Sequence, residues 1–348
     1  MQCAQVISIH VILDHRLGSG KDVLTSLHAQ TWQDFQVVLL GTVDGIQDTR
    51  SIDDDRTIRL KNYRDLGFAR MHNQAIALAL SRWHQQDLRE RFIVLSHQDV
   101  VWDDVALERL HHAFREDPAL MIAGPTLLRA RRVPQDDEGG YEVERTEEIE
   151  SQGLSLTRSR RWRERYCGTQ GVVHRMGEWE SVFGVSEPCL MIRASALADL
   201  QLSGEYLDPD LPTGQEIFDL MWRAAWLGMS VGLVTHACVW HYAHYPAVAR
   251  SWIRRWLLWY AAPALHQRCT EEWRDLLELK NDDAFLRLRH TPWIMRAKLM
   301  SFFRLLADPR CWRSPHDPDR WFRIRQKRRE LQKRRRVTRA QMLRWFRV

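Results

Sequence analysis

Short apolar runs alternate with helical patterns over the first 123 residues, and this order constrains the fold more than any other feature. Strands are expected at 6–13, 35–40, 57–60, 92–95 and 120–123, and helices at 23–29, 68–83 and 105–114. A β-α-β-α order forms a mostly parallel sheet with helices on both faces. Ligands of such sheets bind beyond the carboxyl ends of the strands. We therefore expect an α/β, Rossmann-like domain with its site at that edge.

The remainder of the chain is less regular. Residues 129–165 are polar and charged, which is typical of a long excursion or mobile loop. Regularity resumes at 182–192, followed by a helix at 215–227 that ends at Gly228, and by strands at 230–234 and 237–240. The expected domains are 1–245, a helical accessory region at 246–318 with aromatic, basic segments at 251–260 and 292–300, and a basic tail at 319–348.

The composition is that of a globular protein without repeats. The 348 residues are 45% hydrophobic, enough for one large core. Six scattered cysteines without a Cys-x-x-Cys pair argue against a disulfide framework or a zinc ribbon and favour reduced thiols. The N-terminus lacks the features of a signal peptide, and no apolar run reaches the ~18 residues of a spanning helix. These features predict a cytoplasmic protein.

Charge is unevenly distributed along the chain. Residues 320–348 contain 13 Lys and Arg and one acid, Glu330, so the net charge of +6 divides into +12 on this tail and −6 elsewhere. Aromatic residues such as Trp321, Phe322 and Trp345 lie among the arginines. This composition suits the surface of an anionic membrane, suits nucleic acid less well because the tail is its only support, and also fits a solvated tail.

Two segments carry polar groups at the ends of expected strands. In Ser96-His97-Gln98-Asp99-Val100, the Asp99 carboxylate follows an apolar strand, where it could bind Mg²⁺ or Mn²⁺ or cap the following turn. In Val239-Trp240-His241, a histidine follows a strand, where it could ligate a metal or be a partly buried structural residue.

Two helices carry further candidate groups. Gly67 opens a helix whose backbone N–H groups could face an anion, and Asn73 lies within that helix. Glu216, Asp219 and Arg223 are spaced to share one face of the later helix. The two acids could supply a general base for an acceptor hydroxyl, or the three residues could form a solvated salt-bridge stripe.

The order of these segments resembles the family 2 glycosyltransferases with a GT-A fold, over about residues 6–245. The matching segments are Leu66-Gly67-Phe68-Ala69 with Asn73, His97-Gln98-Asp99, Gly204-Glu205-Tyr206-Leu207-Asp208, Glu216-Ile217-Phe218-Asp219-Leu220-Met221-Trp222-Arg223, and His241. The His-Gln-Asp-Val form also resembles a bacterial branch of glycosyltransferase-like proteins.

The resemblance implies an inverting transfer from a nucleoside-diphosphate sugar to a glycan or lipid-linked acceptor, in bacterial cell-surface polysaccharide synthesis, near the inner face of the membrane. Asp99 and His241 would bind the divalent metal, and Glu216 would be the base, with Asp219 beside it. The residues implied for the nucleotide sugar are Asp44, Asp65, Gly67, Asn73, Gln98 and Arg223.

Three positions depart from the family pattern. Gly41 stands where an acid is expected after the second strand, His97 replaces an acid of the metal motif, and Ile217 replaces the usual base. Either Glu216 serves as the base, or the chain is a non-catalytic, GT-A-like binding or scaffolding module.

Overall fold

The computed structural model describes residues 5–14, 20–43, 46, 55–134, 141–158, 162–171, 177–211, 214–242, 282, 285–287, 291–293, 295–296, 299 and 318–347. The chain divides into two compact units, the first formed by Met1–Ser155 with Trp162–Ala243 and the second by Leu156–Arg161 with His244–Val348. Among the helices described, none combines the length and the apolar character needed to cross a membrane.

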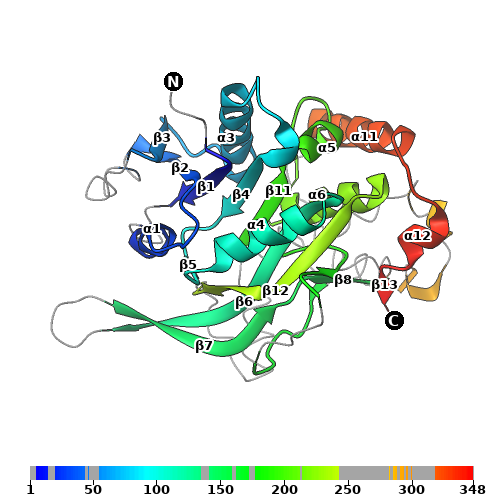
Figure 1. The fold of residues 1–348 in the computed structure, drawn as a ribbon. Helices are drawn as coiled ribbons and strands as arrows, with labels where there is room; N and C mark the ends of the chain where they lie inside the picture. Colours follow the sequence, from blue (N-terminus) through cyan, green and yellow to red (C-terminus); the bar gives the residue numbers. More distant parts are fainter. Residues whose placement is uncertain are drawn as a thin grey trace, which may run out of the picture. The chain divides into compact units, whose positions relative to one another are not determined.

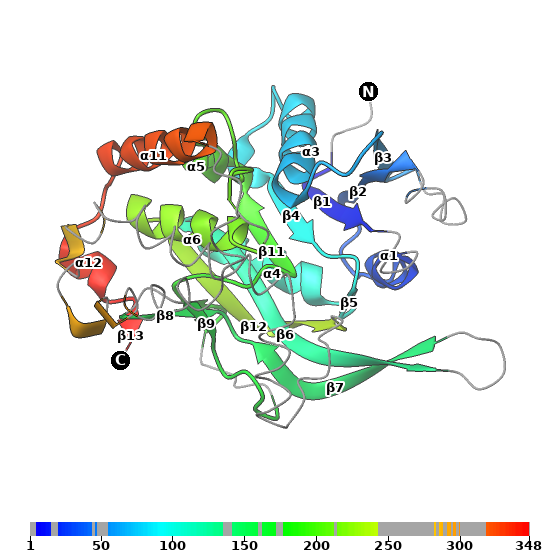
Figure 2. The same ribbon diagram turned by 180° about the vertical axis from the view of Figure 1, so that it is seen from behind.

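Over about its first 123 residues, the first unit alternates strands and helices as expected (Figures 1 and 2). Its first part comprises β1 (Ile7–Leu13), α1 (Lys21–His28), β2 (Phe35–Thr42), β3 (Thr57–Asn62), α3 (Phe68–Arg82), the 3₁₀ turn η2 (Leu88–Glu90), β4 (Phe92–Ser96), β5 (Val100–Trp102) and α4 (Ala106–Glu116). Its second part comprises β6 (Leu120–Pro134), β7 (Tyr141–Ser151), β9 (Trp162–Glu164), β10 (Glu180–Ser181), β11 (Cys189–Arg193), η3 (Ala194–Ala196), α5 (Leu197–Leu200), α6 (Glu216–Leu227) and β12 (Ser230–His241); β8 (Leu154–Thr157) begins in this unit.

One central sheet has the order β10-β12-β6-β11-β4-β1-β2-β3, with β5 paired to β12 and β7 to β6. Strands β4, β1, β2 and β3 are parallel to one another, and β12 is parallel to β6. Strand β11 runs antiparallel between β4 and β6. The two strands expected at 230–234 and 237–240 form the single strand β12, whose register shifts between Val234 and Cys238.

The helices cover both faces of this sheet because alternate strand residues point to opposite sides. On one face, Ile9 and Val37 pack in a cluster with Leu24 of α1 and Leu110 of α4. On the other face, Val38 packs in a separate cluster with side chains of α3. Buried strands covered on both faces are continuously apolar, which explains the apolar runs of the sequence.

Residues 129–165, expected to form a long excursion or mobile loop, contain regular strands in their described part. Strand β6 continues to Pro134 and pairs with β7 in a long antiparallel hairpin, which extends from the sheet in Figure 1. Most residues of the outer part of β7 are exposed, whereas its last three residues are buried. The charged composition of this segment therefore reflects exposure to water and not an absence of regular structure.

The second unit contains α11 (Pro318–Lys333), α12 (Arg339–Leu343) and β13 (Phe346–Arg347). Thr338 caps α12, because its hydroxyl accepts from the Gln341 backbone at 3.3 Å while the Gln341 side chain accepts from the Thr338 N–H at 2.8 Å. Phe346 pairs with Leu156 in parallel register. The helix expected at 251–260 lies outside the described residues, and the described residues of 292–300 are helical.

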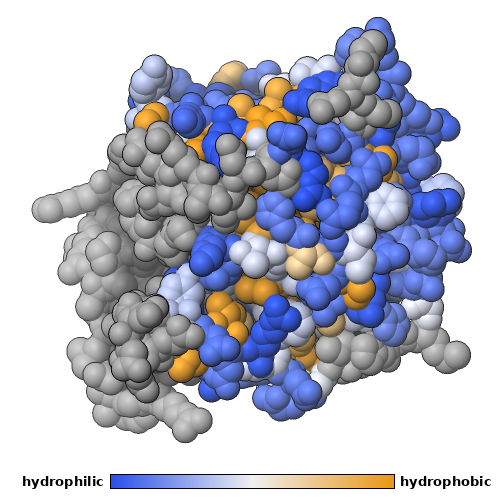
Figure 3. Space-filling view, turned by 60° about the vertical axis from the view of Figure 1, so that its left-hand side comes forward, coloured by the Kyte–Doolittle hydropathy of each residue, from blue (hydrophilic) through white to orange (hydrophobic). Residues whose placement is uncertain are grey.

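The surface seen in Figure 3 is mainly hydrophilic among the described residues, and its hydrophobic side chains are scattered. Many large apolar side chains lie inside, with Trp83, Trp102, Trp222 and Trp226 among the largest that are fully buried. The core of the first unit is thus well formed, and it supports the strand ends that carry the candidate site.

Candidate metal centre and active site

The sheet topology brings three chain segments to one edge. Strands β4 and β12 point in the same direction, because the antiparallel strand β11 separates β4 from β6, and β6 is parallel to β12. The carboxyl ends of β4 and β12 and the start of β11 therefore meet at the edge where ligands bind in such sheets. Backbone hydrogen bonds join these segments. The His97 N–H donates to the Pro188 carbonyl at 3.0 Å, and the Tyr242 N–H donates to the Asp99 carbonyl at 3.0 Å.

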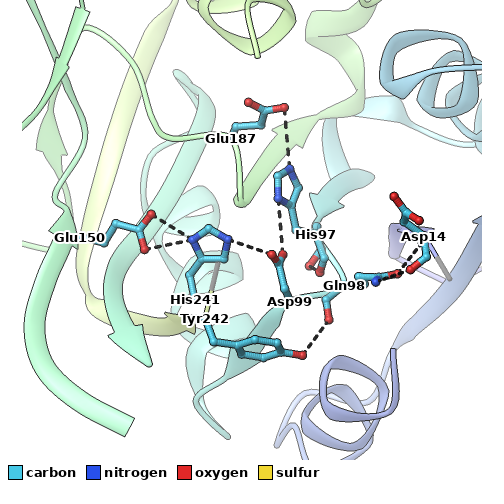
Figure 4. Close-up of polar contacts among 9 residues, drawn as sticks. Asp14, His97, Gln98, Asp99, Glu150, Glu187, His241 and Tyr242 are labelled. Carbon is cyan, nitrogen blue, oxygen red and sulfur yellow. Dashed lines mark hydrogen bonds and ion pairs between the residues drawn. The ribbon is translucent and has the colours of Figure 1, made fainter. Parts of the chain in front are cut away.

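His97, Asp99 and His241 converge at this edge (Figure 4). Each offers one ligand atom, and these atoms all lie within 4.8 Å of one another. His241 Nε2 is 3.4 Å from Asp99 Oδ2, and His97 Nδ1 is 3.6 Å from Asp99 Oδ1. The predicted pair Asp99 and His241 is thus brought together, and His97 joins it.

These three side chains fit a divalent metal ion. Two ligands bound about 2.1 Å from one ion lie roughly 3.0–3.4 Å apart. The 3.4 Å between His241 Nε2 and Asp99 Oδ2 falls in this range, and the 3.6 Å between His97 Nδ1 and the other oxygen, Oδ1, is slightly longer. His241 Nε2 is buried, and none of the described residues makes a well-directed hydrogen bond with it, although Asp99 is near. A buried ring nitrogen beside a carboxylate is a suitable metal ligand.

Two glutamates contact the outer sides of the histidines. Both carboxylate oxygens of Glu150, near the end of β7, lie 3.0 Å from His241 Nδ1. Glu187 Oε1, from the loop before β11, lies 3.8 Å from His97 Nε2. Each histidine therefore has one nitrogen toward Asp99 and the other toward a glutamate (Figure 4).

The carboxylates dominate the electrostatics of the centre. Burial by itself lowers the pKa of both histidines, but the contacts of His97 with Asp99 and Glu187 raise its pKa to about 10. Contacts with Asp99 and Glu150 raise the pKa of His241 to about 9. Burial by itself raises the pKa of Asp99, but its contacts with the two histidines hold that pKa far below the usual range. The centre therefore has a strong affinity for positive charge.

Gln98 links the segment 97–99 to the end of β1. Its Nε2 donates to Asp14 O at 2.9 Å, and its Oε1 accepts from the Asp14 N–H at 2.6 Å. The Tyr242 hydroxyl donates to the carbonyl of Gln98 at 3.3 Å. These contacts give Gln98 a positioning role at the edge of the sheet, and its assignment to the nucleotide sugar stays a prediction.

Glu216 lies buried at the start of α6. Its Oε2 accepts from the N–H groups of Gly214 and Gln215 at 2.7 and 3.0 Å. Burial, helped by the negative charge of Glu187 and opposed by these backbone bonds, raises the pKa of Glu216 to about 7. Glu187 is near the same loop, since its Oε2 is 3.9 Å from the position of a Cβ added to Gly214. Glu187 thus lies between the metal centre and Glu216.

Asp219 and Arg223 form a buried ion pair one helical turn further along α6. The distance from Arg223 Nε to Asp219 Oδ2 is 2.8 Å, and the two side chains are 1% and 4% exposed, respectively. The guanidinium also donates to Leu200 O. These contacts give the pair a role in holding α6 in position. The catalytic role of Asp219 and the nucleotide-sugar-binding role of Arg223 remain predictions.

The other predicted nucleotide-binding residues lie around the start of α3. The Asp65 carboxylate accepts from the Gly67 N–H at 2.8 Å and shapes the turn that begins the helix. Asn73 exchanges two bonds of 2.8 Å with the backbone of Leu207 and also contacts Glu205. Asn73 thus holds the 204–208 segment. Asp44 lies outside the described residues.

Sequence reasoning did not identify His97, Glu150 or Glu187 as members of the centre. His97 offered a signal, because it occupies a position of the metal motif where an acid is common. Glu187 precedes an apolar strand, as a residue of the ligand-binding edge can. Glu150 offered none, because it lies in a segment rich in charged residues.

No protein-family model matches this sequence, and neither does any curated protein. Among solved structures, the chain is similar to GalNAc-T7 in a crystal structure with UDP, GalNAc and Mn2+, at 14% identity and a TM-score of 0.50, over 70% of this chain. This chain spans 45% of that GalNAc-T7 chain. It also matches the S. aureus TarS 1-349 structure in complex with UDP-GlcNAc, at 12% identity and a TM-score of 0.45, over 91% of this chain and 79% of that chain.

At this level of identity, the likeness concerns the fold. The chain is a mixed α/β protein whose central sheet, flanked by helices, matches GT-A-like structural neighbours. The fold class expected from the sequence is therefore confirmed.

Proposed function

We propose that this chain transfers a sugar from a nucleoside-diphosphate sugar to an acceptor hydroxyl, with inversion at the anomeric carbon. One observation carries the proposal: His97, Asp99 and His241 offer ligand atoms within 4.8 Å of one another at the ligand-binding edge of a GT-A-like sheet. A divalent ion held there would neutralise the charge that develops on a diphosphate leaving group.

The metal proposed for this centre is Mn²⁺ in preference to Mg²⁺. Magnesium is a hard ion that favours oxygen ligands and keeps several waters, whereas imidazole suits transition metals better. Two of the three candidate ligands are histidines. The presence of UDP, GalNAc and Mn2+ in the GalNAc-T7 structure supports the same combination of nucleotide and ion here.

The remaining chemistry is assigned to residues of this chain. In one displacement, the acceptor oxygen forms a bond to the anomeric carbon while the bond from that carbon to the diphosphate oxygen breaks. Glu216 accepts the hydroxyl proton, as its pKa of about 7 suits a base at neutral pH. Asp219 and Arg223 keep α6 in place for this role. Asp44, Asp65, Gly67, Asn73 and Gln98 are proposed for the nucleotide side of the site.

A donor screen tests the proposal. Full-length protein is incubated with UDP-, GDP- and dTDP-sugars, MnCl₂ and candidate glycan acceptors, and the release of nucleoside diphosphate is followed. We expect turnover of one donor, abolished by EDTA and restored by Mn²⁺. Proton NMR of the product then reports inversion or retention. Absence of turnover and of binding with every donor would contradict the proposal.

The alternative is a non-catalytic module with the same fold. It is favoured by Ile217, which occupies the usual base position and is 2% exposed, with no group that could accept a proton. A thermal-shift measurement with UDP and Mn²⁺ separates the two. A shift in melting temperature without turnover of any donor favours the module, and turnover favours the enzyme.

We propose an anionic membrane surface near a lipid-linked acceptor as the site of action, in bacterial cell-surface glycan synthesis and on the cytoplasmic side. Helix α11 supports this, because Phe322 is 66% exposed and Arg323, Arg325 and Arg329 are exposed beside it. Flotation with vesicles containing about 30% phosphatidylglycerol tests it. We expect the full chain to bind these vesicles and the chain truncated at Arg320 not to bind them. Unchanged flotation of the truncated chain would contradict the membrane proposal. Binding of the tail to nucleic acid is the competing outcome.

A further inference from the structure

We propose that Glu150 and Glu187 are positioning carboxylates of the metal centre: each orients one histidine toward Asp99, and both increase the affinity of the centre for a divalent cation. This inference rests on the metal site of the proposed function. It adds two residues, from β7 and from the loop before β11, that belong to neither of the motifs carrying the metal ligands.

Glu150 makes the closer contact. Both of its oxygens are 3.0 Å from His241 Nδ1, and the side chains of Glu150 and His241 are 8% and 6% exposed. A carboxylate that accepts the Nδ1–H of a neutral imidazole leaves the lone pair on Nε2. That nitrogen is the one 3.4 Å from Asp99 Oδ2. The contact therefore selects the tautomer and the ring orientation that a metal ligand requires.

Glu187 makes the equivalent contact with the other histidine, with the two ring nitrogens exchanged. Its Oε1 is 3.8 Å from His97 Nε2, while His97 Nδ1 faces Asp99 at 3.6 Å. The Glu187 side chain is 24% exposed, and that of His97 is 29% exposed. Because this contact is longer and closer to water, it contributes less than that of Glu150.

The charge balance supports the same conclusion. Asp99, Glu150 and Glu187 surround two imidazoles, and the five side chains carry three negative charges once a metal has displaced the protons from the two nitrogens that face Asp99. A simple ion pair would need one carboxylate for each histidine. The third carboxylate and the shared direction of the two rings toward Asp99 are explained by a cation bound among them.

Direct measurement of Mn²⁺ binding tests the inference independently of catalysis. Metal-free, full-length protein is titrated with MnCl₂, and free Mn²⁺ is measured by electron paramagnetic resonance. We expect Glu150→Gln to weaken binding about 10- to 100-fold and Glu187→Gln to weaken it less. The matched control is Glu148→Gln on the same strand, because Glu148 pairs with Arg129 at 2.7 Å and not with a histidine; its affinity should stay within about twofold of the wild-type value.

One further variant separates orientation from charge. The side chain of Glu150→Gln can still accept the Nδ1–H of His241, whereas Glu150→Ala removes both the acceptor and the charge. Glu150→Ala should therefore weaken Mn²⁺ binding more than Glu150→Gln. The visible spectrum of the Co²⁺-loaded protein should change in Glu150→Ala, because the His241 ring loses its orientation. Melting curves in EDTA identify variants that fail to fold. If the variants at position 150 fail to fold, the affinity of Glu187→Gln for Mn²⁺ tests the inference, because Glu187 is more exposed.

The outcomes are distinguishable. Wild-type protein that binds Mn²⁺, an Asp99→Ala variant that does not, and glutamate variants that bind like the wild type would overturn this inference and leave the metal site intact. Wild-type protein that binds no Mn²⁺, with or without UDP, would instead remove the metal site and the metal-dependent form of the proposed function.

Discussion

Two buried clusters of charge in the first unit are built in opposite ways. Along α6, Asp219 and Arg223 form a closed pair of one acid and one base, 2.8 Å apart. At the ends of β4 and β12, Asp99 lies between two histidines at 3.4 and 3.6 Å, with further carboxylates outside them. The closed pair satisfies its own charges and stabilises a helix. The open cluster keeps an excess of negative charge directed at one point, as a ligand site requires.

The largest effect is expected at the centre of the open cluster. Asp99→Ala removes the carboxylate shared by both histidines, so it should abolish measurable Mn²⁺ binding and lower the rate of transfer by about 10²- to 10³-fold or more. Metal titration and donor turnover measure the two effects. A cooperative melting transition of the variant in EDTA serves as the folding control, and an unchanged rate would show that the cluster is not a metal site.

The closed pair should respond through stability. Arg223→Met removes the guanidinium 2.8 Å from a buried carboxylate, and we expect a loss of about 3–5 kcal/mol in the free energy of unfolding. The double variant Asp219→Leu/Arg223→Met should lose less, because no charge is left unpaired. Urea denaturation measures both. A single variant within about 1 kcal/mol of the wild type would mean that the pair contributes little to the fold.

Glu216 lies between the two clusters and should link stability to pH. Its pKa is raised to about 7 in the folded protein from 4.5. The unfolded chain therefore ionises first, and the stability present below pH 4.5 is lost as the pH rises through about 7, by about 3 kcal/mol.

Glu216→Gln cannot ionise and can still accept the two backbone bonds. This variant should be more stable relative to the wild type at pH 8 than at pH 5, so the difference in the free energy of unfolding, variant minus wild type, should be larger at pH 8. Glu164, whose pKa burial also raises to about 7, should leave a remaining slope in both proteins. If the free energies of unfolding of variant and wild type differ by the same amount at pH 5 and pH 8, the raised pKa of Glu216 is disproved.

The smallest effect is expected at the end of α6. Gly228 has φ 73°, in the left-handed region, and its N–H closes the helix on Ala224 and Ala225. Gly228→Ala should cost about 1 kcal/mol of stability, because the added Cβ disfavours this conformation. Denaturation of Gly228→Ala beside the reference variant Ala225→Gly, for which helix propensity predicts a similar cost, calibrates the larger effects along α6. A Gly228→Ala variant as stable as the wild type would place the helix end elsewhere.

The fold could be predicted from the sequence wherever the signal was local. The apolar runs at 6–13 and 92–95 form β1 and β4, and the helical spacing at 68–83 forms α3, each within a few residues. The hairpin of β6 and β7 was not predicted, because its exposed, charged strands lack the apolar alternation of a half-buried strand and are identified only by pairing with each other.

The sequence by itself determined the class of fold, because its apolar runs and helical patterns are local signals. Its resemblance to the family 2 glycosyltransferases also implied two ligands of the candidate centre, Asp99 and His241. Only the tertiary structure decided that His97 joins them and that Glu150 and Glu187 contact the histidines from outside. Glu150 and His241 are 91 residues apart in the chain. Their contact depends on the register of β7 on β6 and of β6 on β12, which no local pattern encodes.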